Sequence, residues 1–162
     1  MAFIGDSNII QMKVQHSTVW ANRNSTSPGE IHTDYRFTFT PKRSDSIIMI
    51  MYHLYSQTAT DHALNQYQIR DTSGNIIQSA NINGQSRANS NCTTRGQYNS
   101  DNARFINPCV TENSYSGSKT YTLYCWSWAG DIIRHCHSSG YTSTTVHFGT
   151  TMKMFGYEIE DI

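Results

Sequence analysis

The sequence has little charge and no excess of either sign. Of its 162 residues, 12 are Lys or Arg and 12 are Asp or Glu, so the formal charges cancel. Charged residues make up 15% of the chain, whereas an average domain has roughly 25%. A binder of the nucleic-acid backbone needs a basic surface. We therefore expect a mostly neutral, polar surface and no nucleic-acid partner.

The beginning of the chain lacks a basic segment followed by a long apolar run. MAFIGDSNIIQMK has neither the pattern of a signal peptide nor the length of a membrane span. We expect no membrane contact, and a protein that stays soluble unless another component exports it.

No cysteine pair has the CxxC spacing of a zinc ribbon or a thioredoxin-like motif. The four cysteines are Cys92, Cys109, Cys125 and Cys136. Without an export signal, folding in a reducing compartment is expected, and free buried thiols follow from that. A disulfide between any two of them stays open on the sequence alone.

Sequence motifs of catalysis are also missing. There is no nucleophile elbow G-x-S-x-G and no phosphate-binding P-loop. Most of the few acidic residues sit in apparent turns, where local backbone hydrogen bonds explain them better than paired carboxylate catalysis. These include Asp45, Asp71, Asp101 and Asp131. We expect no enzyme activity, no catalytic residue and no cofactor.

Apolar residues that are present recur with period two, which indicates strands rather than helices. Ile10, Met12 and Val14 alternate with polar residues. Residues 35–39 show the clearest case: Tyr35, Phe37 and Phe39 are placed on one face, and Pro41 ends the run.

Residues 46–56, SIIMIMYHLYS, are apolar in both phases, which predicts a central strand buried on both faces. A helix is the rival interpretation, but no capping pattern closes the segment. Residues 65–79 then predict a hairpin, with Gly74 supplying a positive φ in its turn. The polar stretch 81–101 predicts a long surface loop or a weakly paired edge strand, and it is the leading candidate for a contact surface.

Short β-patterns continue to the end of the chain, at 104–108, 118–128, 131–138, 144–149 and 151–160. With about eight or nine strands and no credible helix, the fold class predicted is all-β, an antiparallel two-sheet sandwich of the jelly-roll or immunoglobulin-like kind. No linker or repeat divides the chain, so residues 1–162 are expected to form one domain, with 1–8 as an N-terminal arm.

Two clusters could carry binding chemistry. His135 and His137 would point to one face of a strand, and His147 lies on a neighbouring segment, as metal ligands can. No acidic ligand follows until Glu158, so we expect ordinary strand histidines and no metal. Trp126 and Trp128, with Tyr124 beside them, could stack on sugar rings, or could face the core or a subunit interface.

The order of motifs resembles that of jelly-roll domains in tail-fibre, head-fibre and capsid-decoration proteins of tailed bacteriophages, especially those of cyanobacteria. Phe39, Thr40 and Pro41 lead into the apolar segment 47–51. The late strand holds Tyr121 and Leu123, and the closing strand ends in Tyr157, Glu158 and Ile159. The resemblance runs from about residue 8 to the end of the sequence.

This resemblance implies a homotrimer on a virion, made in the host cytoplasm. No fibre shaft, collagen-like tract or heptad repeat precedes the domain, which favours a capsid decoration or cement protein over a fibre tip. The expected partners are further copies of the chain and the major capsid protein or another virion protein. A fibre-type module that binds a carbohydrate or a receptor, with a surface glycan as ligand, is the alternative.

Overall fold

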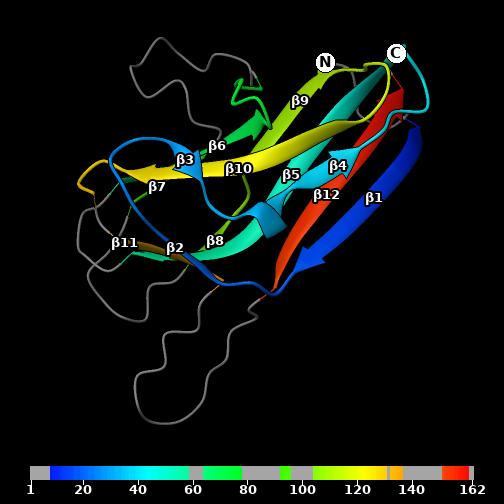
Figure 1. The fold of residues 1–162 in the computed structure, drawn as a ribbon. Coiled ribbons are helices and arrows are strands. Elements are labelled where there is room, and N and C mark those ends of the chain that lie inside the picture. Colours follow the sequence, from blue (N-terminus) through cyan, green and yellow to red (C-terminus); the bar gives the residue numbers. More distant parts are fainter. Residues whose placement is uncertain are drawn as a thin grey trace, which may run out of the picture.

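The computed structural model describes residues 8–58, 64–77, 92–95, 104–130, 132–136 and 151–160. Within this part the chain is almost entirely β-structure, arranged as two antiparallel sheets packed face to face (Figure 1). The predicted all-β jelly-roll sandwich is confirmed. The described residues hold twelve strands rather than eight or nine, because several segments of two to five residues form strands of their own.

The larger sheet has seven strands built around one long strand. Its members are β1 (Ile9–Ser17), β2 (Ala21–Asn24), β5 (Ser46–Thr58), β8 (Arg104–Ile106), β9 (Cys109–Asn113), β11 (Ile132–His135) and β12 (Met152–Glu160). The strand β5 pairs with β9 and β12 along its first half and with β8 and β11 near its end. The strand β1 pairs with β12 and forms the right-hand margin in Figure 1.

The smaller sheet has five strands around β10. Its members are β3 (Gly29–Glu30), β4 (Phe37–Phe39), β6 (Leu64–Asp71), β7 (Cys92–Arg95) and β10 (Lys119–Ser127). A 3-10 turn, Thr33–Tyr35, leads into β4. No helix in the described part is long and apolar enough to cross a membrane.

The core lies between the sheets and is filled by alternate residues of each strand. Tyr35, Phe37 and Phe39 are 0%, 0% and 1% exposed, which confirms the face predicted from their alternation. The inner face of β5 adds Ile48 and Ile50, which are fully buried.

The prediction that β5 is buried on both faces is wrong. Its second phase, which includes Ile47, Met49 and Met51, is only partly buried. These side chains point away from the smaller sheet, and no further layer of described residues packs on them. In β5 both alternating sets of residues are apolar: one set lies in the core and the other forms an apolar outer surface.

The hairpin predicted at 65–79 is present as far as residue 77, and residues 78–79 lie outside the described residues. Gly74 has the expected positive φ of 84°, and the Asp71 carboxylate accepts hydrogen bonds from the Ser73 and Asn75 backbone N–H groups. Beyond the turn, Arg70 and Ile76 form a bridge and the Ile77 N–H donates to Ile69 O at 3.2 Å.

Of the two alternatives for 81–101, the described residues show a short edge strand, because β7 pairs with β6 at the margin of the smaller sheet. The rest of that stretch, the predicted strand at 144–149 and residues 1–7 of the predicted arm lie outside the described residues.

Side chains of β1 tie the two sheets together along one margin. Three alternate residues of β1 extend their side chains toward the smaller sheet, and each donates a hydrogen bond to a backbone carbonyl in or next to β4. Gln11 Nε2 donates to Thr40 O at 2.7 Å, Lys13 Nζ to Thr38 O at 2.6 Å and Gln15 Nε2 to Arg36 O at 3.0 Å. These three bonds join β1 of the larger sheet to the segment around β4 of the smaller sheet.

Candidate interaction surfaces

The outer side of the seven-stranded sheet carries a regular block of apolar side chains, here called the apolar face. Direct pairing across β1, β12 and β5 sets three rows on one side of the sheet. The rows are Ile9–Ile159–Ile47, Met12–Tyr157–Met49 and Val14–Phe155–Met51. The Phe155 and Tyr157 rings stack, with centroids 6.3 Å apart and planes 11° apart.

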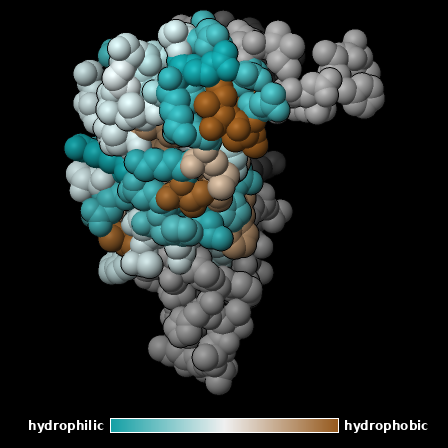
Figure 2. Space-filling model, turned by 90° about the vertical axis from the view of Figure 1, so that its right-hand side faces the viewer, coloured by the Kyte–Doolittle hydropathy of each residue, from teal (hydrophilic) through white to brown (hydrophobic). Residues whose placement is uncertain are grey.

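The apolar face is open to solvent at its β1 side. Ile9 is 61% exposed, Met12 58% and Val14 36%, and the other six residues are partly buried. None of the nine carries a formal charge, and the row beyond Val14 brings in Lys153. Figure 2, which looks at the side where β1 lies, shows brown hydrophobic patches among teal residues. A contiguous apolar sheet face of this kind is typical of protein contact sites.

The structure places the candidate aromatics Tyr124 and Trp126 on the outer face of the smaller sheet and not in the core. Tyr121, Leu123 and Cys125 are the β10 residues that face inward. Trp128 follows β10 in a turn and is 67% exposed. The interpretation in which these three aromatics fill the core is therefore wrong, because β10 alternates in the opposite phase.

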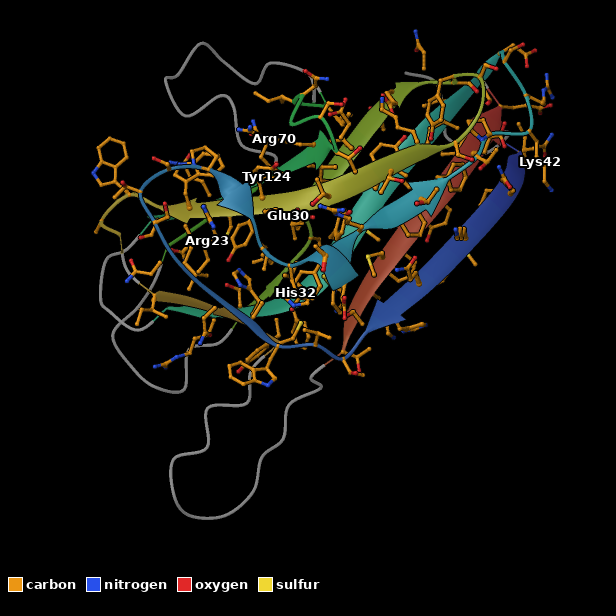
Figure 3. All side chains as sticks on the ribbon, viewed as in Figure 1. Arg23, Glu30, His32, Lys42, Arg70 and Tyr124 are labelled. Atoms are coloured by element: carbon orange, nitrogen blue, oxygen red, sulfur yellow. The ribbon has the colours of Figure 1, made fainter. Side chains whose placement is uncertain are left out.

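Polar groups cover part of this outer face. The Arg70 guanidinium lies 4.6 Å from the Tyr124 ring centroid and donates to Gln68 at 2.7 Å (Figure 3). Glu30 accepts two hydrogen bonds from Arg36, at 2.7 and 2.8 Å, and these bonds hold its pKa below the ordinary value despite partial burial. The Arg70 guanidinium therefore covers one face of the Tyr124 ring.

The candidate metal ligand His135 lies in the core. It is fully buried at the end of β11, and its ring meets the Tyr67 ring edge-on at 5.8 Å. Neither ring nitrogen has a hydrogen-bond partner within the described residues. The Ala21 backbone lies close to the ring and acts to raise its pKa. Burial lowers the pKa of His135 to about 3, so the ring is neutral.

The remaining members of the predicted histidine cluster, His137 and His147, lie outside the described residues. Within the described part no three His, Cys, Asp or Glu side chains gather as a metal site requires. Cys109, Cys125 and Cys136 are free thiols, and burial raises the pKa of Cys125 to about 12. The Cys92 side chain is outside the described part.

Comparison with known proteins found no matching family model, and no curated protein matched. Among solved structures, the chain is similar to a mutant VP2 protein of infectious bursal disease virus, with a TM-score of 0.42 and 6% identity over 93% of this chain and 36% of that one. A second similar structure is that of the Gx strain of the same virus, with a TM-score of 0.27 and 10% identity over 93% of this chain and 37% of the other. The chain thus spans about a third of the length of the structures it matches, and neither likeness bears on what it does.

Proposed function

We propose that the chain is a non-enzymatic structural protein of a virion, a capsid decoration or cement protein that forms a homotrimer. The observation that carries this proposal is the apolar face, with nine apolar residues and no formal charge on the outer side of a sheet. The resemblance of residues 8 to the end to phage jelly-roll domains supports the setting on a virion, and the two-sheet sandwich agrees with it.

Burial of this face supplies the driving force for association. Removing a large apolar side chain from water is worth about 1.5 to 3 kcal/mol at full burial. Met12 and Val14 are 58% and 36% exposed, so part of that gain is still available at each. A closed ring of three copies lets every copy cover the face with a neighbour.

The mass in solution tests the trimer. The monomer is 18.4 kDa, and light scattering after size exclusion of a dilute sample is expected to give about three times that mass. Met49→Glu, which places a charge within the apolar face, should shift the protein toward the monomer. Ser116→Glu, in an exposed turn between β9 and β10, is the matched control. A monomer in the unmodified protein would overturn the trimer.

The cement role has a separate test. A protein that binds only the assembled shell stabilises it by mass action. Shells of the cognate major capsid protein should therefore break at a higher temperature with this protein than without it, and the Ser116→Glu variant should retain the effect. Equal disruption temperatures with and without the protein contradict the cement role.

Glycan binding is the second candidate function, favoured by the position of two tryptophans. Trp126 lies on an outer sheet face and Trp128 is 67% exposed, and exposed aromatic side chains on a sheet can stack on sugar rings. A glycan array should give hits that Trp128→Ala removes. Trp20→Ala is the matched control, since Trp20 is 59% exposed between β1 and β2. An array without hits, or one unchanged by Trp128→Ala, contradicts this function.

A further inference from the structure

The strand β1 forms an edge of the larger sheet. Among the described residues its only partner strand is β12, and it lies at the margin of the molecule in Figure 1. One register shift falls between Ile9 and Gln11, and pairing from Gln11 to Ser17 is regular. A regular edge of this length presents a row of backbone N–H and C=O groups that a further strand can pair with.

The side chains that usually protect such an edge are engaged elsewhere. Edges are commonly blocked by lysine, proline or a bulge. Here Lys13 Nζ donates to Thr38 O at 2.6 Å and lies 5.4 Å from the Phe37 ring centroid. Its charge is therefore bound to the smaller sheet of the same molecule and does not block the free edge of β1. Gln15 is held in the same way by Arg36 O. On the opposite side of β1 stand the exposed Met12 and Val14.

We propose that β1 pairs antiparallel with β1 of a second copy about a two-fold axis at Val14. The strand's own sequence favours this register over the one centred at Lys13. An axis at Lys13 would set two lysines directly opposite each other, which destabilises a strand pair. An axis at Val14 sets Val14 opposite Val14 of the second copy, and Lys13 opposite its Gln15.

The register also sets Met12 opposite His16 of the second copy, so no like charges meet along the strand. Paired residues lie on the same side of a sheet, so the apolar faces of the two copies become one continuous surface. This contact does not rest on the proposed function. It uses the edge of the sheet and two-fold symmetry, whereas the proposed trimer uses the apolar face and three-fold symmetry.

Cysteine cross-linking tests the register. Cys109 is a half-buried free thiol, so it is first replaced by Ser to reduce background. Val14→Cys in that background should form a covalent dimer under mild oxidation, because the two introduced thiols face each other at cross-strand distance. Met12→Cys is the matched control and should cross-link at least tenfold more slowly, since it faces His16. Equal cross-linking of the two variants, or none with Val14→Cys, overturns the proposal.

A charge exchange gives an independent readout that folding defects cannot imitate. Val14→Lys and Val14→Glu should each lose the two-fold contact in sedimentation over a concentration series, and an equimolar mixture should regain it. Met49→Glu should leave this contact in place while it impairs the proposed trimer, so the two proposals fail separately. A mixture that sediments as the sum of its two separate variants overturns the edge pairing.

Discussion

Glu158 binds the backbone N–H of Lys42 with both carboxylate oxygens, at 3.0 and 2.8 Å. The same carboxylate accepts the Arg43 N–H at 2.8 Å and the Ser46 hydroxyl at 2.8 Å. It is 0% exposed, shielded by these partners. Burial by itself would raise the pKa of Glu158, but the hydrogen bonds outweigh it and hold the pKa below its ordinary value. One side chain of β12 thus fixes the loop that enters β5.

Glu158→Gln should destabilise the fold by about 2 kcal/mol, because it removes charge-assisted hydrogen bonds and turns an amide N–H₂ toward donors. Urea unfolding at neutral pH measures the loss. Glu160→Gln is the control: Glu160 bonds Arg43 and Asn8 at the surface, and its loss should be smaller. Since the folded pKa of Glu158 is lowered, its contribution is present above the ordinary value of 4.5 and fades as the pH falls. Equal losses in the two variants would contradict this role.

Gly156 is required by the packing of two phenylalanines. A Cβ at this position would lie 2.5 Å from Phe39 Cδ2 and 2.7 Å from Phe37 Cε1. Gly156→Ala should therefore cost about 1 to 3 kcal/mol by overpacking the core. Thermal or urea unfolding measures the cost, and Phe39→Leu tests the cause: the double variant should lose less than the sum of the two single losses. Additive losses would show that the clash is not with Phe39.

The pattern of alternate residues predicted the core well where one face of a strand is aromatic. Tyr35, Phe37 and Phe39 could be assigned to the interior because period two leaves only one other face, and that face is polar. The same rule cannot orient a strand that is apolar on both phases. Ile48 and Met49 look alike in the sequence, yet one is in the core and the other on the apolar face.

Contacts between distant segments were beyond the sequence. The Glu158 carboxylate and the Lys42 N–H are 116 residues apart, and no local pattern links them. The phase of β10 was likewise ambiguous, because Tyr121 and Tyr124 are equally aromatic and only the packing sends Tyr121 inward. An edge strand such as β1 has a partner strand on one side only. It can therefore be identified only when the strand order of the whole sheet is known.

His135 is a neutral imidazole enclosed by the core, and it should make the fold sensitive to mild acid. In the unfolded chain its pKa is the ordinary 6.5, and in the folded protein burial lowers the pKa to about 3. Between these values the unfolded state binds more protons, so stability rises with pH and falls as the medium becomes acidic. The loss attributable to this ring between pH 8 and pH 5 is about 2 kcal/mol, at about 1.4 kcal/mol per pH unit below 6.5.

His135→Leu should remove that pH dependence, because leucine has a similar volume, packs against Tyr67 and has no titrating group. Urea unfolding at pH 8 and pH 5 measures the difference, a window that lies above the range in which Glu158 titrates. His16→Gln, on exposed β1, is the control and should keep the wild-type dependence. If His135→Leu loses as much stability as the wild type on going to pH 5, the acid sensitivity arises elsewhere and His135 is not its source.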